Sequence, residues 1–222
     1  MLYENVKEAV FINRPNRFIA EVEVEGRREK VHVKNTGRCR ELLIPGARVV
    51  LEPGKTPGRK TACDLIAVEK PGMGWINIDS QAPNKVVLEW LRKASWDLIK
   101  PEFTFGSSRI DFYMEKDGER YLMEVKGCTL EIDGEGWFPD APTQRGTKHL
   151  KELTAALKEG FHSIIAFVIQ MEGVYSVQAN KSTDPEFAAA LEEAERAGVK
   201  ILYLPCRVEA DSLEISCDTF KA

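Results

Sequence analysis

The sequence lacks the features of a membrane or exported protein. No run approaches the roughly 18 consecutive apolar residues that a membrane-spanning helix needs. The N-terminal MLYENVKEAVF carries acidic residues where a secretory signal peptide has a basic segment followed by an apolar one. Hydrophobic residues make up 43% and charged residues 30% of the 222 positions, which is typical of a soluble globular protein with a substantial core. We therefore expect a cytoplasmic protein without membrane contacts.

Disulfide and zinc patterns are also lacking. The five cysteines are odd in number, scattered and never spaced as C-x-x-C, which argues against a disulfide framework and a zinc site. Free cysteines are commonly buried as small apolar residues. The three histidines, His32, His149 and His162, include no pair at i and i+4 that could bind zinc together. The chain has no G-x-S-x-G, G-x-x-x-x-G-K-[ST] or G-x-G-x-x-G motif either.

An overall positive charge is missing as well, since the formal net charge is −4. The charge is nevertheless distributed unevenly. Between Gly26 and Lys60 there are 10 basic and 3 acidic residues, and such a segment on an acidic protein indicates a local patch for a polyanion. A solvated loop face is the alternative, because the sequence does not show whether these side chains converge. The candidate phosphate contacts are Arg27, Arg28, Lys30, Lys34, Arg38 and Arg40.

The pattern of polar and apolar residues along the sequence changes near residue 80. Residues 1–80 hold short alternating segments, separated by Gly26 and several Pro-Gly pairs. These segments are FIAEVEVEG, REKVHV, ARVVLEP, CDLIAVEK and WINI. Short strands at this spacing, with no helical period, predict a small β-barrel or sandwich. A five-stranded OB-fold-like barrel that binds nucleic acid is the simplest architecture at this length.

Residues 81–222 combine helical and extended patterns. Asn84 is the expected N-cap of a helix over KVVLEWLRKASW, and TQRGTKHLKELTAALKEG predicts a second helix that stops at Gly160. DPEFAAALEEAERAG predicts a third, with Asp184 as N-cap and Gly198 at its end. FHSIIAFVIQM is apolar almost throughout, as expected of a central strand, KILYLP adds another strand, and EIDGEGWFPDAP is expected to be a loop. This order predicts an α/β (α+β) domain, with helices flanking a mixed sheet.

RIDFYMEKDGERYLMEVKG, residues 109–127, predicts a β-hairpin with Asp117-Gly118 as its two-residue turn. That turn fixes the register, so that one face of the hairpin is apolar and the other is charged. The pairs expected at the open end are Ile110–Val125 on the apolar face, and Asp111–Glu124 and Arg109–Lys126 on the charged face. Like charges directly across a strand pair are destabilising, so this pattern suggests a function.

A divalent cation between Asp111 and Glu124 would relieve the repulsion. Mg²⁺ (or Mn²⁺) is typically held by one or two carboxylates plus substrate phosphate, and it activates water for phosphodiester hydrolysis. Lys126 would point to the same face as Glu124 and position or activate the water, and the Val125 carbonyl could complete the site. We interpret Asp111, Glu124 and Lys126 as catalytic, with Glu89 of the preceding helix as a further metal ligand. The alternatives are a surface hairpin with solvent-facing charges and an ordinary exposed Glu89.

GWFPDAPTQRGTKHL, a loop that enters a helix, is a second candidate for anion contacts. A helix start offers unpaired N–H groups and the positive end of the helix dipole to an anion. Gln144, Arg145, Lys148 and His149 add further donors, and we interpret Arg145 and Lys148 as phosphate contacts. The alternatives are basic residues on a solvated helix face and, for His149, a position in the core.

Three blocks of the sequence resemble, in order, the sugar fermentation stimulation protein A (SfsA) family. HVKNTGRCRELLIPG resembles that family's N-T-G-R…E-L-L-x-P-G signature, and the other blocks are SRIDFYMEKDGERYLMEVKGCTL and FPDAPTQRGTKHLKEL. The likeness runs from RPNRFIAEVEVEG to the last helix, with slight departures at Lys34 and at Gly127-Cys128. It implies an N-terminal OB-fold, a C-terminal PD-(D/E)xK nuclease-like domain, DNA binding and a regulatory link to sugar metabolism. The residues that match the family's motifs are Asp111, Glu124 and Lys126, and Asn35, Thr36, Gly37 and Arg38.

Our interpretation is a DNA-binding protein that hydrolyses phosphodiester bonds with Mg²⁺, with DNA favoured over RNA. Phe18 or Trp75 would stack on bases unless the core buries them. One alternative is a non-enzymatic DNA-binding regulator of sugar (maltose) metabolism on a nuclease scaffold, whose binding would depend on salt but not on Mg²⁺. Another is a homo-oligomer in which the basic segment meets an acidic face of another copy.

Overall fold

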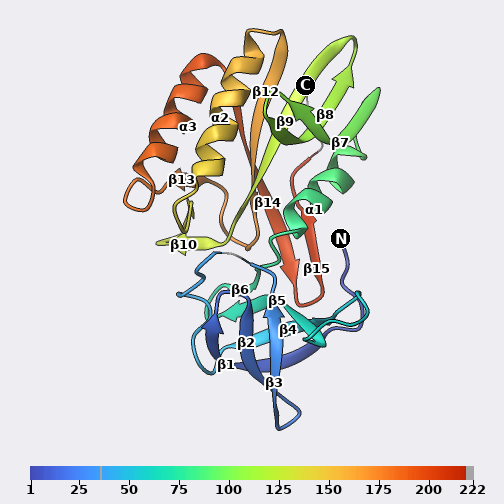
Figure 1. Ribbon diagram of the computed structural model, residues 1–222, viewed down its shortest axis with the longest axis vertical. Coiled ribbons are helices and arrows are strands. Elements are labelled where there is room, and N and C mark those ends of the chain that lie inside the picture. Colours follow the sequence, from blue (N-terminus) through green and yellow to red (C-terminus); the bar gives the residue numbers. More distant parts are fainter. Residues whose placement is uncertain (36, 219–222) are drawn as a thin grey trace.

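The first part of the chain is a closed β-barrel. The computed structural model describes residues 1–35 and 37–218 (Figure 1). The barrel strands are β1 (Lys7–Asn16), β2 (Ile19–Val24), β3 (Arg27–Val33), β4 (Arg48–Pro53), β5 (Cys63–Lys70) and β6 (Gly74–Asn77). Their order is β3-β2-β1-β4-β5-β6, and a parallel pairing of β3 with β5 closes β1 to β5 into a barrel. This is the topology of an OB-fold, as predicted.

Alternating side chains build the barrel wall. In β2, Ala20, Val22 and Val24 are buried, whereas Glu23 between them is exposed. The prediction was wrong about which strands close the barrel, because it omitted β1 and included WINI, which is β6 and lies outside the ring. Two register shifts in the pairing of β1 with β2 interrupt the alternation along KEAVFINRPN, which is why its sequence shows no period of two.

The second part is built on a six-stranded mixed sheet. Its strands are β7 (Leu98–Phe105), β8 (Ser108–Lys116), β9 (Glu119–Cys128), β12 (Phe161–Ile169), β14 (Lys200–Glu209) and β15 (Ser212–Ile215). The order is β15-β14-β12-β9-β8-β7, and β12 pairs in parallel with both β9 and β14. Nearly every residue of β12 is buried, which confirms the prediction of a central strand in FHSIIAFVIQM.

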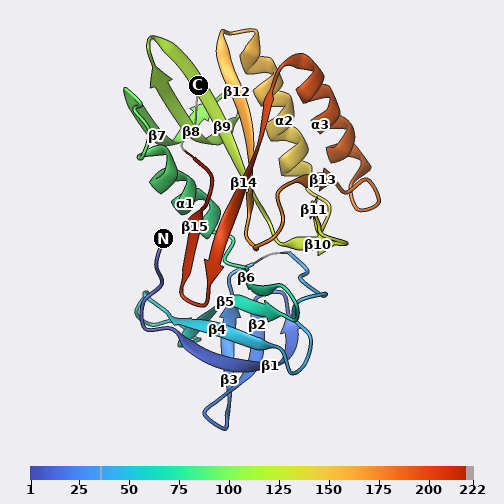
Figure 2. The same cartoon turned by 180° about the vertical axis from the view of Figure 1, so that it is seen from behind.

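Helices cover both faces of this sheet. α1 (Ala82–Leu91) packs on one face, while α2 (Gln144–Leu157) and α3 (Pro185–Ala197) pack on the other (Figure 1 and Figure 2). α1, the strands β7, β8 and β9, α2 and β12 follow in the order of a PD-(D/E)xK nuclease core, the fold that the family resemblance implies for this part. Asp184 and Gly198 cap α3 as expected, whereas α1 begins before Asn84 and places that residue in its first turn.

Short strands account for the remaining differences from the prediction. EIDGEGWFPDAP, expected to be a loop, contains β10 (Leu130–Ile132) and β11 (Glu135–Phe138), which join β13 (Val177–Ala179) in a small sheet. β15, which follows β14 through a tight turn, was not predicted either. These strands have three or four residues each, and so few positions cannot show a period of two.

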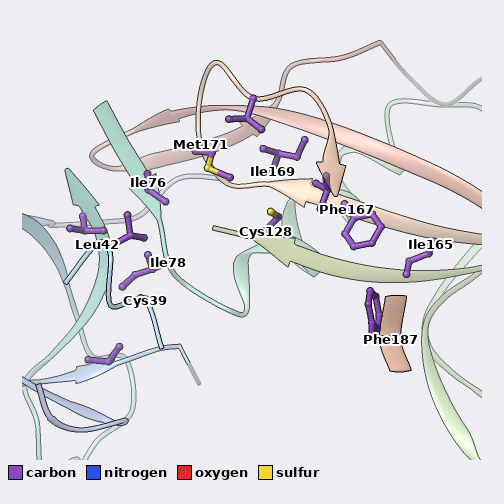
Figure 3. Close-up of a cluster of buried hydrophobic side chains, with 14 of the residues drawn as sticks. Cys39, Leu42, Ile76, Ile78, Cys128, Ile165, Phe167, Ile169, Met171 and Phe187 are labelled. Carbon is purple, nitrogen blue, oxygen red and sulfur yellow. The ribbon is translucent and has the colours of Figure 1, made fainter. Parts of the chain in front are cut away.

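The barrel and the second part share one hydrophobic core at their junction. Leu42, Ile76 and Ile78 from the first part lie in the same buried cluster as Ile169 and Phe187 from the second (Figure 3). None of the helices formed by the described residues has the length and apolar content needed to cross a membrane. A shared core fixes the barrel against the sheet and therefore fixes which loops of the barrel can reach the nuclease-like part.

Polar contacts reinforce this junction. The Gln170 side-chain amide donates hydrogen bonds to the Asn77 carbonyl at 3.0 Å, the Asn77 side-chain oxygen at 2.9 Å and the Asp79 carbonyl at 3.2 Å. The chain start also lies on the second part, since the Tyr3 N–H donates to the Asp211 carbonyl at 2.8 Å. Residues before and after the junction are thus joined at several points.

Candidate metal-dependent site

The turn and the neighbouring pairs of the hairpin form as predicted. Asp117 and Gly118 have φ values of 52° and 81°, and a type I′ turn requires positive φ at both positions. From the turn to Phe112↔Met123, every pair has the predicted register. On one face of this stretch the buried side chains of Phe112, Met114 and Met123 pack with α1. The turn therefore sets the register of the hairpin as far as Phe112.

The hairpin changes at Asp111. The pairing of β8 with β9 stops at Phe112, so the predicted pairs at the open end are absent from this described stretch, and that part of the prediction was wrong. Instead, the Asp111 Oδ2 accepts a hydrogen bond from the Val125 N–H at 2.8 Å. A side-chain oxygen thus takes the place of a backbone acceptor, and the regular ladder cannot continue. Ile110 consequently packs in the core on the α2 face, opposite the face on which Phe112 lies.

The other neighbour of β8 is irregular at the same level. The register of β7 with β8 places Glu102 across from Asp111, and Glu102 has a φ of 57°, in the left-handed region. The Glu102 carboxylate forms an ion pair with Arg109 at 3.5 Å. Arg109 is therefore directed toward β7 and does not oppose Lys126, as the regular register had predicted.

Glu124 lies at the centre of the site and is 2% exposed. Its Oε1 accepts a hydrogen bond from the Lys126 Nζ at 2.7 Å and a very short one from His149 Nδ1. Burial by itself would raise the pKa of Glu124, but the hydrogen bonds from His149 and Lys126, together with the charge of Lys126, outweigh it and lower that pKa. Glu124 Oε2 is buried and has no hydrogen-bond partner among the described residues. One oxygen of an ionised, buried carboxylate is thus left available.

Asp111 is held beside Glu124 by two hydrogen bonds. Besides the Val125 N–H, the Asn84 side-chain amide of α1 donates to Asp111 Oδ1 at 2.7 Å. Burial raises the pKa of Asp111, and the negative charge of Glu124 raises it further. The two carboxylates are therefore close enough to repel one another, as the sequence predicted, although they are not a cross-strand pair.

His149 is the contact to Glu124 that the sequence did not identify. It is buried on α2, where it shares the apolar stripe of Gly146, Leu150 and Leu153. Its Nε2 accepts a hydrogen bond from the Arg145 Nε at 3.3 Å. The sequence left His149 open between an anion donor and a core residue. Its place in the stripe indicated burial, but its partner lies 25 positions away in the chain.

Glu89 does not reach this site, so its predicted role as a metal ligand is corrected. Its side chain is 50% exposed and forms an ion pair at 2.7 Å with the N-terminal amine of Met1. At 100° per residue, the five positions between Asn84 and Glu89 rotate the side chain by roughly 140° around the helix. Because Asn84 faces Asp111, Glu89 must face away from it.

The donors in the site fit a hard divalent cation. No group of three or more His, Cys, Asp and Glu side chains among the described residues is arranged as a complete metal cage. Mg²⁺ does not need one, because it is commonly held by one or two carboxylates with water and substrate phosphate. The unpartnered Glu124 Oε2 and the adjacent Asp111 carboxylate supply such a pair.

Four of the predicted phosphate contacts lie away from the site or are occupied. Arg27, Arg28 and Lys30 lie at the start of β3, at the end of the barrel farthest from the second part (Figure 1). Lys34 forms an ion pair at 2.7 Å with Asp79, whose side chain is fully buried. A lysine held in this way stabilises the junction, so we no longer interpret Lys34 as a phosphate contact.

The other predicted contacts have varied surroundings. Arg38 and Arg40 are exposed near the junction, and Thr36 of the same block lies outside the described residues. Lys148 donates to the Ser107 carbonyl at 3.1 Å and thereby holds the β7–β8 turn against α2. Of the two aromatic residues, Phe18 is half exposed, while Trp75 is partly buried against the core.

Comparison with known proteins identifies the family. The family model for the SfsA N-terminal OB domain matches residues 12–78, and that for the sugar fermentation stimulation protein RE domain matches residues 81–212. A sugar fermentation stimulation protein homolog of Desulfitobacterium hafniense (strain Y51) is 51% identical over 217 residues, covering 96% of this chain and 95% of that protein. A homolog of Ruminiclostridium cellulolyticum is 50% identical over 219 residues, covering 97% and 96%.

A solved structure agrees with this assignment. The structure of Pyrococcus furiosus SfsA in complex with Ca²⁺ superimposes with a TM-score of 0.84 at 30% sequence identity, covering 96% of this chain and 94% of that one. The same two parts occur in the same order along nearly the whole of both chains. The protein therefore belongs to the sugar fermentation stimulation protein family.

Proposed function

We propose that this protein binds DNA and hydrolyses its phosphodiester bonds with Mg²⁺ or Mn²⁺ held by Asp111 and Glu124. The observation that carries the proposal is the Glu124 carboxylate, which is buried and charged but has one oxygen without a protein partner. An unsatisfied buried carboxylate oxygen is unfavourable unless something binds it. The Ca²⁺ in the structure of the Pyrococcus furiosus relative supports a divalent cation as the ligand.

The surrounding residues fix the two carboxylates in place. His149 and Lys126 hold Glu124 Oε1, which leaves Oε2 for the cation, while Asn84 and the Val125 N–H orient Asp111. A divalent cation bound there would lower the pKa of bound water and offset charge on the phosphodiester.

Lys126 and Arg145 supply the positive groups beside these carboxylates. Lys126 is only slightly exposed, and its ammonium group lies at the carboxylate pair, where it can donate to the attacking water or to a phosphate oxygen. Arg145 is exposed at the start of α2 and can contact a phosphate while it supports His149. Because Lys148 is bonded to Ser107, Arg145 is the phosphate contact that we retain from α2.

Glu124→Gln tests the proposal, with Glu119→Gln as the matched control. Glu119 is on the same strand but exposed, and it pairs with His162. Wild type should bind Mn²⁺, measured by electron paramagnetic resonance, and cleave DNA in Mg²⁺ or Mn²⁺. Glu124→Gln should lose both, by more than the roughly 100-fold that removal of an outer-shell partner costs a metal site. It should retain DNA affinity in EDTA and a cooperative melt.

Two results would overturn the proposal. One is the absence of Mg²⁺- or Mn²⁺-dependent cleavage by wild type on single-stranded, double-stranded and branched DNA. The other is cleavage by Glu124→Gln at the wild-type rate. DNA binding that is unaffected both by metal and by Glu124→Gln, without any cleavage, would instead identify a non-enzymatic DNA-binding protein on a nuclease scaffold.

A further inference from the structure

Three exposed arginines gather at the junction of the barrel with the second part. Arg17 lies in the turn between β1 and β2, and Arg38 and Arg40 lie in the segment that follows β3. Together with Arg14 they line a cleft of about 520 Å³. These residues come from two separate segments, so the fold is what brings their charges together.

Arg14 fixes the two segments to each other. Its Nη2 donates to the carbonyls of Arg17 and Asn35 at 2.6 and 2.8 Å, and its Nη1 donates to the carbonyls of Gly37 and Arg38 at 3.0 and 2.7 Å. With its guanidinium occupied by backbone oxygens, Arg14 acts as a structural link. It holds the backbone of Arg17 next to that of Arg38.

The three outer arginines are left without acidic partners. Among the described residues, Arg17, Arg38 and Arg40 form no ion pair with a carboxylate, although Arg17 lies 5.4 Å from the Phe18 ring centroid. Two acids lie in this region: Asp140, whose Oδ2 accepts a hydrogen bond from the backbone N–H of Arg38 at 2.9 Å, and Glu41, which follows Arg40 in the chain. The cleft therefore keeps an excess of positive charge that is available to a ligand.

This cleft continues toward the candidate site. It shares Arg17 and Gly37 with a second cleft of about 340 Å³, whose other walls include Pro83, Gly127 and Thr143. Pro83 precedes Asn84, which orients Asp111, and Gly127 follows Lys126. Thr143 is the N-cap of α2. The arginines thus lie at one end of two adjoining clefts, and the other end is lined by the chain neighbours of Asn84 and Lys126.

Two glycines that line these clefts are closely packed against neighbouring side chains. A Cβ atom on Gly37 would lie 2.3 Å from the Asp140 Oδ2, and one on Gly127 would lie 2.3 Å from the Gln170 Oε1. A side chain at either position would therefore clash with its neighbour. Glycine at these two positions therefore lets the backbone approach Asp140 and Gln170 closely where the two clefts are lined.

We propose that Arg17, Arg38 and Arg40 bind backbone phosphates of a DNA strand and guide that strand to the Glu124–Lys126 site. Guanidinium groups can form bidentate hydrogen bonds with phosphate oxygens. Exposed arginines without acidic partners also have no ion pair to break when they bind a phosphate. The inference rests on the proposed function in taking DNA as the ligand. It goes further by placing the DNA contact at the junction of the barrel with the second part, and not at the basic residues at the start of β3.

The basic residues at the start of β3 provide an internal comparison. Arg27, Arg28 and Lys30 are also exposed, but Arg28 and Lys30 share the Glu21 carboxylate. The turn beside them lies at the end of the barrel away from the second part (Figure 1 and Figure 2). They equal the junction arginines in number of charges and also belong to the barrel, but they lie at its opposite end and line neither cleft.

The test compares two triple variants of the full chain, each with three basic side chains changed to glutamine. Arg17→Gln/Arg38→Gln/Arg40→Gln removes the junction charges, and Arg27→Gln/Arg28→Gln/Lys30→Gln is the control. Affinity for a fluorescent DNA oligonucleotide is measured in EDTA at several salt concentrations. The junction variant should lose at least about tenfold in affinity, and its salt slope should fall by about 1 for each lost phosphate contact. The control should change less than about twofold.

The inference would be overturned if the two variants lost DNA affinity equally or if the control lost more. It would also be overturned if wild type did not bind DNA at low salt. Melting curves check that each variant folds. Arg40→Glu alone, which changes one exposed side chain, repeats the comparison if the triple variant does not fold. Because binding is measured without metal, selective loss in the junction variant would support this inference even if wild type failed to cleave DNA and the proposed nuclease function were rejected.

Discussion

Lys34→Met tests whether Lys34 stabilises the junction or contacts phosphate. The Lys34 Nζ lies 2.7 Å from the Asp79 Oδ2, and the two side chains are 12% and 0% exposed. Methionine keeps an unbranched apolar stem but removes the ammonium group. Asp79 would then retain the Gln81 N–H at 2.8 Å and the Tyr3 hydroxyl at 3.3 Å, with no positive partner.

The expected loss of stability is large. Removing one partner of a buried ion pair costs about 3–5 kcal/mol, because a charge remains buried without compensation. For a chain of this size each kcal/mol corresponds to about 2–4 °C, so the melting temperature should fall by about 6–20 °C. Lys30→Met is the matched control. Lys30 is 71% exposed and 4.0 Å from the nearest carboxylate oxygen, so its loss should stay within about 0.5 kcal/mol.

Calorimetry and DNA titration on the same variants separate the two roles. A structural Lys34 gives a lower melting temperature with unchanged DNA affinity at a temperature where the variant is folded. A phosphate contact would instead give an unchanged melting temperature and a salt slope reduced by about 1, and that result would refute our reasoning. Asp79→Asn in the Lys34→Met background should recover part of the lost stability, since it removes the uncompensated charge.

Two further predictions concern stability. Burial raises the pKa of Asp64, but hydrogen bonds from Arg59 and His32 outweigh it and hold that pKa below its ordinary value. The stability that the ionised Asp64 adds to the folded state is therefore complete above the unfolded-state pKa of about 4. It is lost as the pH falls through the lower pKa of the folded state. In urea melts at pH 7, Asp64→Asn should have a lower free energy of unfolding than wild type, and this difference should narrow below about pH 4. A difference that stays the same at all pH values would contradict the prediction. Gly127→Ala should lose about 1–3 kcal/mol through overpacking against Gln170, and an unchanged melting temperature would show that Gln170 moves freely.

Local patterns predicted the scaffold of the site. The Asp117-Gly118 dipeptide and the alternation on either side of it gave the hairpin, its turn and the register out to Phe112. The apolar run of β12 and the caps of α3 were also correct. Each of these features depends on residues that are close together in the sequence, and turn geometry or side-chain alternation links those residues directly.

The partners of the functional residues could not be predicted in the same way. The sequence shows which residues of α1 are polar, but not which end of the helix lies over Asp111, so Glu89 was chosen where the structure uses Asn84. Lys34 was assigned to a phosphate because its carboxylate partner, Asp79, comes 45 positions later. Such pairings are set by how the barrel, the helix and the sheet pack together. They depend on the whole fold.

The irregularities around Asp111 agree with the proposed cation site. Asp111 replaces a backbone acceptor, Glu102 opposite it has left-handed backbone geometry, and Glu124 keeps a buried oxygen without a partner. Left-handed geometry and an unsatisfied buried acceptor each cost on the order of 1–3 kcal/mol, and repulsion between the two carboxylates adds to this. Three strands that served only stability would avoid all three costs by regular pairing and opposite charges. A cation would offset the cost of the unsatisfied oxygen by binding it, and it would neutralise the repulsion between the two carboxylates. We therefore infer that the local geometry is adapted to a positively charged ligand.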